Sequence, residues 1–184
     1  MFEIVSWVGL LMAGAVTELA LAKRHGGEPS PIGHLTDRIV QALTVVSIGG
    51  PPLLTAILDR SPGTFSAVAG SAIGATGVVL RAFAMAALGA RYQLTPRPVK
   101  SVAGIVIRGP YAFVRHPGYS GLLLFFTGLG LVSGGALGMM FVAPLLLGVL
   151  ARIRVEEEIL RQELGAAYIL YSKEVRWKLI PMVL

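Results

Sequence analysis

The chain has 184 residues, of which 54% are apolar and only 14% are charged, whereas a soluble domain carries charges at about a quarter of its residues. This deficit and the mean hydropathy of +0.73 indicate that lipid is the main solvent of the chain. The absence of cysteine excludes disulfides, thiolate nucleophiles and cysteine-ligated metals.

Five apolar stretches approach the roughly 20 helical residues needed to cross a hydrocarbon core of ~30 Å. They run from about Ile4 to Ala22, Ile39 to Leu58, Phe65 to Ala90, Tyr119 to about Val132, and Ala136 to about Ile153. Ser133, Gly134 and Gly135 separate the last two stretches and predict a tight turn, hence a helical hairpin. The first stretch follows Glu3 and has no basic flank, so we predict a retained span rather than a cleaved signal peptide.

The basic residues predict an orientation. If the N-terminus is outside, fourteen of the sixteen Lys and Arg residues fall on the inner side, leaving Arg60 outside and Arg81 within a span. Arg38 then belongs to the first inner loop. The net charge of +6 therefore indicates topology rather than nucleic-acid binding. We expect an integral protein of a prokaryotic cytoplasmic membrane, with its C-terminus in the cytoplasm.

Two charges fall within the predicted spans, Glu18 in the first and Arg81 in the third. Each either reaches the inner interface through its apolar stem or pairs with a partner at a functional cavity. Both interpretations remain open from the sequence.

The inner loop from Arg91 to Gly118 contains prolines and glycines that exclude a continuous helix. Its apolar run from Ile105 to Ile107 could cover a ligand or anchor the loop at the membrane surface. After Ile153 the sequence predicts a charged amphipathic helix up to Trp177. This helix is interrupted at Gly165 and carries Tyr168 and Tyr171 on one face.

Two charged motifs mark the two ends of the hairpin and should therefore face the same side of the membrane. The first is RHPGYSG at residues 115–121, where Pro117 suits the first turn of a helix and His116 precedes it. A helix N-terminus attracts anions such as a carboxylate. In the absence of other signals, this motif can also be a helix-entry turn with Tyr119 as an interfacial anchor.

The second motif is RIRVEEE at residues 152–158. Arg152 and Glu156 are four residues apart and share one helix face, whereas Glu157 points about 100° away. The two carboxylates can therefore address different groups. By itself, this run can also be the charged collar where a helix leaves the membrane.

The order GPYxFVRHPGYSG, an apolar hairpin, RxxxEEExL, GxxYxxYxxxV and a final Ile-Pro resembles the isoprenylcysteine carboxyl methyltransferase family, with phospholipid methyltransferases as more distant relatives. The resemblance covers roughly residues 80 to 181. It implies one all-α membrane domain over residues 1–184, in which 1–63 supply N-terminal spans and 64–184 the catalytic part. The expected architecture has five transmembrane helices, a C-terminal cytoplasmic helix and a cofactor-binding loop between helices three and four.

The resemblance also implies S-adenosylmethionine as cofactor and S-adenosylhomocysteine as product. The cofactor-binding candidates are Ile105, Val106, Gly109, Tyr111, His116, Pro117, Tyr119 and Glu157. Arg152 and Glu156 match the catalytic pair that lies beside the methyl acceptor in that family. The expected partners are a lipophilic or lipidated acceptor, which enters from the bilayer, and membrane lipids; we expect neither nucleic acid nor metal.

Methyl transfer needs mainly that the acceptor atom lie within about 3 to 3.5 Å of the methyl group. An acceptor carboxylate is already nucleophilic and could be oriented by a bidentate arginine, whereas an amine would need Glu156 as a base. Leu122 to Phe126 are apolar where eukaryotic members carry Trp and polar residues, which argues against prenylcysteine itself.

A carboxylate acceptor is our first expectation. The alternatives are an amine or phospholipid methyltransferase, a nicotinamide-dependent membrane reductase that shares RHPxY, and a lipid-binding helical bundle without chemistry.

Overall fold

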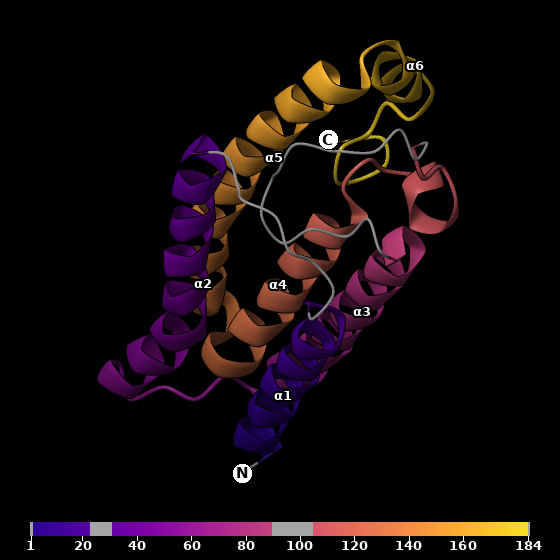
Figure 1. Ribbon diagram of the computed structural model, residues 1–184. Helices are drawn as coiled ribbons and strands as arrows, with labels where there is room; N and C mark the ends of the chain where they lie inside the picture. Colours follow the sequence, from indigo (N-terminus) through magenta and orange to yellow (C-terminus); the bar gives the residue numbers. More distant parts are fainter. Residues whose placement is uncertain (1, 23–30, 90–104, 184) are drawn as a thin grey trace.

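The computed structural model describes residues 2–22, 31–89 and 105–183, and these ranges form a helical bundle (Figure 1). Its helices are α1 (Phe2–Ala22), α2 (Pro31–Ile57), α3 (Thr64–Leu88), α4 (Pro117–Gly138), α5 (Val142–Leu164) and α6 (Ala166–Glu174). Two short 3₁₀ turns, η2 (Gly109–Ala112) and η3 (Met139–Phe141), precede α4 and α5. The predicted all-α class is confirmed for the described part of the chain.

Three helical stretches of the described chain are long and apolar enough to cross a membrane: His34–Ile57, Thr64–Leu88 and Pro117–Leu164. The last of them includes both α4 and α5, and α1 contributes a shorter apolar stretch, Glu3–Thr17. The predicted membrane character is therefore confirmed at this level. The number of five spans stays a prediction, as does the extent of the inner loop, since residues 90–104 lie outside the described ranges.

Helix α2 begins at Pro31 instead of near Ile39, so Arg38 lies on a helix and its assignment to a loop is wrong. A proline is tolerated in the first turn because the N–H that it lacks would have no helical partner there. The earlier start also places Asp37 on the helix, at the end of α2 that lies beside α5 (Figure 1).

The hairpin turn includes Gly135, as predicted, but extends further along the chain, up to Phe141. The backbone departs from helical geometry at Gly135, with φ 56° and ψ −145°, and α5 begins only at Val142 after the 3₁₀ turn. A positive φ is accessible to glycine without the steric cost that a side chain brings. Beyond Gly135 the chain returns so closely that a Cβ on Gly138 would meet the backbone of Gly130. Helices α4 and α5 consequently form the predicted hairpin.

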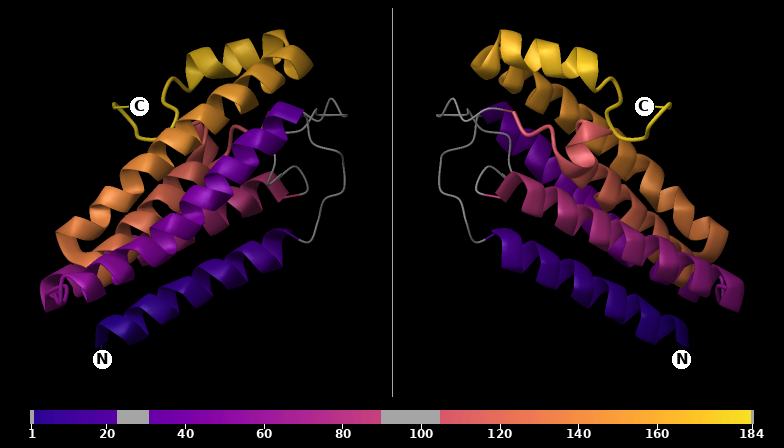
Figure 2. Two further views of the ribbon diagram at one scale, coloured as in Figure 1. Left: turned by 90° about the vertical axis from the view of Figure 1, so that its left-hand side faces the viewer. Right: turned by 90° about the vertical axis from the view of Figure 1, so that its right-hand side faces the viewer.

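The most extensive helix contact joins α3 to α4 and depends on glycine. A Cβ on Gly128 would collide with the backbone of Gly70 and Gly74, and one on Gly77 with the backbone of α4. Small residues let membrane helices approach closely. Helix α1 packs on the same pair, on the side of the bundle away from α5 and α6 (Figure 2).

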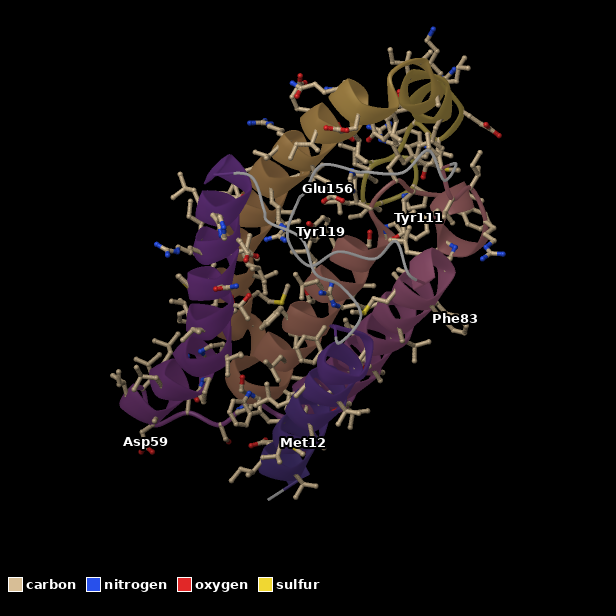
Figure 3. The ribbon with its side chains drawn as sticks, viewed as in Figure 1. Met12, Asp59, Phe83, Tyr111, Tyr119 and Glu156 are labelled. Carbon is tan, nitrogen blue, oxygen red and sulfur yellow. The ribbon has the colours of Figure 1, made fainter. Side chains whose placement is uncertain are left out.

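The apolar core lies between α4 and α5, where Leu129, Val132, Leu145 and Val149 are fully buried. Several large apolar side chains of α3 point outward, among them Phe65 and Phe83. Figure 3 shows Phe83 projecting from the outer side of α3. An outward apolar surface of this kind suits lipid. The same packing brings the start of α4 and the charged part of α5 to one end of the bundle.

Candidate active site

The start of α4 is held by the C-terminal segment of the chain. Pro117 is the first residue of α4, and His116 before it has non-helical geometry, with φ −126° and ψ 56°. The backbone N–H groups of Arg115 and His116 donate to the carbonyls of Trp177 and Lys178, both at 2.9 Å. The RHPGYSG motif is therefore fixed by residues near the end of the sequence.

Arg115 extends this attachment to helix α6. Its Nη1 donates to the carbonyl oxygens of Ser172, Val175 and Arg176 at 3.2, 2.9 and 3.1 Å. Carbonyls at the end of a helix lack helical partners, and a cation is favourable there. Arg115 therefore stabilises the end of α6 and turns its remaining nitrogens to Glu157.

Glu157 is the centre of the first charged cluster, and its side chain is only 2% exposed. Its Oε1 accepts from Nε of Arg115 at 3.0 Å and lies 3.4 Å from Nε2 of His116. Its Oε2 lies 2.9 Å from Nζ of Lys178 and 3.4 Å from Nη2 of Arg161. Both carboxylate oxygens are thus engaged by protein groups, and Glu157 orients His116 at the start of α4.

The second cluster is built around Tyr119, in the first turn of α4. Its hydroxyl donates to Oε2 of Glu156 at 2.9 Å and accepts from Nε of Arg152 at 2.7 Å. The guanidinium carbon of Arg152 also lies 5.9 Å from the centroid of the Tyr119 ring, within cation–π range. Figure 3 shows Tyr119 and Glu156 close together near the start of α4. Tyr119 thus bridges the two residues that the sequence assigns to catalysis.

Arg152 has a further partner on α2. Its Nη1 lies 2.6 Å from Oδ1 of Asp37, and Nε2 of Gln41 donates to the other oxygen of Asp37 at 3.1 Å. The four side chains of Asp37, Arg152, Tyr119 and Glu156 form a continuous polar chain from α2 through α5 and α4. This chain contains two carboxylates and one guanidinium.

The structure therefore brings the two motifs at the ends of the hairpin together. Arg152 and Glu156 face the same cluster, as their spacing predicts, and Glu157 faces the other. The rings of His116 and Tyr119, whose centroids lie 5.9 Å apart, connect the two clusters.

The loop candidates lie beside the first cluster and pack against α6. Ile105 contacts the buried group of Tyr168, Tyr171 and Val175, and Val106 is buried. The hydroxyl of Tyr171 donates to the carbonyl of Tyr111 at 3.0 Å. Burial raises the pKa of Tyr171 to about 12, so this hydroxyl remains a donor even at alkaline pH.

Gly109 opens η2 with a positive φ of 62°, a conformation that favours glycine. The predicted shared face of Tyr168 and Tyr171 is confirmed, since both side chains are buried and their rings lie 6.1 Å apart. The predicted break at Gly165 is also confirmed, with φ 53° between α5 and α6.

Of the two charges within predicted spans, Arg81 reaches the start of α4, where its Nη1 donates to the carbonyl of Gly118 at 2.8 Å. Its guanidinium is therefore bound to the protein at the same helix start as the charged clusters. The side chain of Glu18 lies outside the described residues.

Sequence reasoning missed Asp37 and Lys178. Pro31 was a usable signal for Asp37, because a proline is common in the first turn of a helix and places Asp37 on α2. Lys178 carried no comparable signal, since its partner Glu157 is on another element and the two are brought together only by the return of the C-terminal segment.

Comparisons with known proteins agree with the chemistry that this site suggests. The sequence profile of the phospholipid methyltransferase family matches residues 65–167, which include both charged motifs but not α2. No curated protein sequence matches the chain.

Among solved structures, the chain is similar to the eukaryotic intramembrane Ras methyltransferase, isoprenylcysteine carboxyl methyltransferase, in a structure without a monobody. The TM-score is 0.67 at 20% identity, over 100% of this chain and 68% of the other. At this identity the likeness concerns the fold.

Proposed function

Because the chain belongs to the phospholipid methyltransferase family and has the apolar helices of a membrane enzyme, we propose that it transfers a methyl group from S-adenosylmethionine to the polar head of a lipophilic acceptor. S-adenosylhomocysteine is the product. The observation that carries this proposal is the polar chain of Asp37, Arg152, Tyr119 and Glu156 directly beside the first charged cluster, which is centred on Glu157.

The residues of the site fit the cofactor in charge and polarity. S-adenosylmethionine supplies a methyl group on a positively charged sulfur, and the polar chain has one more carboxylate than cation. The start of α4 at His116 and Pro117 suits the cofactor carboxylate. The cofactor half has an apolar wall with backbone polar groups, formed by Ile105, Val106, Gly109 and Tyr111. Tyr119 connects this cofactor half to the acceptor half. Glu157 affects cofactor binding indirectly, because it orients His116 at the start of α4.

The acceptor half consists of Arg152 and Glu156. A carboxylate acceptor is the first candidate, because the buried guanidinium of Arg152 can hold it close to the methyl group. Nε of Arg152 already donates its one hydrogen to Tyr119, so a bidentate grip through Nε and Nη2 requires release of Tyr119, whereas Nη1, which donates to Asp37, has a second hydrogen. A single hydrogen bond from Nη2 needs no such change.

An amine acceptor is the second candidate, favoured by the two carboxylates around one guanidinium. The excess negative charge attracts an ammonium group, and the half-buried Glu156 can accept its proton before methyl transfer. The family match is compatible with this acceptor as well.

For the setting of the reaction, we propose a prokaryotic cytoplasmic membrane, five spans, the N-terminus outside and the active site at the cytoplasmic face. The positive-inside distribution of the basic residues supports this orientation. The cofactor then comes from the cytosol and the acceptor from the bilayer.

Two measurements test the function. Calorimetric titration of folded, detergent-solubilised protein with S-adenosylhomocysteine should give saturable binding; absence of binding up to millimolar concentration contradicts the cofactor assignment. Binding of a nicotinamide cofactor instead would indicate a reductase. If the protein binds neither cofactor, a lipid-binding bundle is indicated.

The second measurement follows label from S-adenosylmethionine into a total lipid extract and identifies the methylated product by mass spectrometry, which separates the two acceptor classes. A prenylated cysteine with a free carboxylate and phosphatidylethanolamine vesicles serve as one defined probe of each class. Arg152→Ala should abolish turnover and retain S-adenosylhomocysteine binding. A variant that retains wild-type turnover contradicts the assignment of Arg152 to the acceptor.

A further inference from the structure

Helix α2 contributes a carboxylate to the reaction centre although it lies outside the residues that the family profile matches. Asp37 is 115 positions from Arg152 in sequence, and the contact between Oδ1 and Nη1 is 2.6 Å. The side chains are 21% and 4% exposed, so water screens this pair poorly. Gln41, one turn further along α2, fixes the second oxygen of Asp37 at 3.1 Å.

Arg152 has a competing partner on its own helix. Arginine and glutamate four residues apart on a helix lie within reach of an ion pair, and Arg152 and Glu156 have this spacing. Within the described part of the chain, Tyr119 instead separates them, accepting from Arg152 and donating to Glu156. The guanidinium is drawn toward α2, where Asp37 compensates its charge.

We propose that Asp37 is a positioning residue that keeps Arg152 from pairing with Glu156 and thereby preserves both groups for the acceptor. The role rests on the proposed function. Contacts at Nε and Nη1 fix the plane of the guanidinium, and the remaining nitrogen Nη2 has no hydrogen bond to another described residue. Loss of Asp37 leaves a buried cation without a directly paired carboxylate, and its alternative partner on the same helix is Glu156.

The test compares Asp37→Asn with Asp59→Asn. Asp59 is exposed just beyond the other end of α2, far from Tyr119 and Glu156, so the same substitution there is a matched control (Figure 3). Methyl transfer is measured with the prenylated cysteine and with phosphatidylethanolamine vesicles. Asp37→Asn should lower kcat at least about tenfold, the loss expected for a hydrogen bond to a charged group, with the KM for S-adenosylmethionine unchanged. Asp59→Asn should match wild type.

A double-mutant cycle separates positioning from general support of the fold. In the Arg152→Lys background, which lacks the planar guanidinium, Asp37→Asn should lower kcat by a much smaller factor than it does in wild type. If Asp37→Asn lowers kcat by the same factor in both backgrounds, the positioning role of Asp37 is overturned. S-adenosylhomocysteine binding by each variant verifies that it is folded.

If Asp37→Asn does not fold, Gln41→Ala replaces it, because this exposed residue only fixes the second oxygen of Asp37. The variant should lower kcat about twofold, a smaller effect than the full loss of a bond to a charged group. If the variant that folds, Asp37→Asn or Gln41→Ala, turns over like wild type, the positioning role of Asp37 is overturned and the proposed function is not affected. A wild type that methylates neither probe nor a total lipid extract overturns the proposed function and this role with it.

Discussion

Replacement of Glu157 by Gln should cost more stability than any other single change of carboxylate to amide on α5. Glu157 is 2% exposed and lies within 3.0 Å of Arg115 and 2.9 Å of Lys178. Removing one partner of a buried ion pair typically costs about 3 to 5 kcal/mol. Lys178 is 32% exposed and can return to water, so we expect the lower value, about 3 kcal/mol.

For a chain of this length, about 3 kcal/mol corresponds to a fall in Tm of roughly 6 to 12 °C. The assay is thermal unfolding in detergent, followed by tryptophan fluorescence. Glu158→Gln is the matched control, because this neighbouring carboxylate is 58% exposed and lies 3.7 Å from Arg161. Exposed pairs contribute at most about 1 kcal/mol, so the control should melt within a few degrees of wild type.

The same variant tests how Glu157 affects the cofactor. Without the carboxylate, His116 loses the negative charge of its partner at 3.4 Å, and we expect the start of α4 to be less well ordered. Calorimetry at a temperature where the variant is folded should show S-adenosylhomocysteine binding weakened about tenfold, as for loss of one charged hydrogen bond. If Glu157→Gln and Glu158→Gln have the same Tm and the same affinity, the buried cluster has no such role.

Two further substitutions test the bridge and the helix packing. Tyr119→Phe removes the hydroxyl between Arg152 and Glu156 and should lower kcat roughly 10- to 100-fold in a folded protein, as loss of hydrogen bonds to charged groups predicts; wild-type turnover would contradict the bridge. Gly128→Ala forces a Cβ against the backbone of α3 and should destabilise the bundle by about 1 to 3 kcal/mol in thermal unfolding. Gly49→Ala, where a Cβ meets nothing within 4 Å, is its control, and equal Tm values would exclude close packing at Gly128.

Much of the fold could be predicted because its signals are local. The apolar stretches define the helices, Gly165 ends α5, and the spacing of Arg152, Glu156 and Glu157 fixes which carboxylates share a face. The predicted helix boundaries are less accurate where several neighbouring residues could form the turn. Gly135 was correctly placed at the break, but the chain needs the 3₁₀ turn up to Phe141 before α5 begins.

The sequence by itself determined that this is an apolar helical protein with two charged motifs at the ends of one hairpin, since helical periodicity and hydropathy act along a single segment. Only the tertiary structure decided how those motifs are completed. Asp37 reaches Arg152 because α2 packs against α5, and Lys178 reaches Glu157 because the C-terminal segment returns to the start of α4. Such contacts depend on the register between separate elements, which no local pattern specifies. The ion pairs that hold the site are therefore decided by packing.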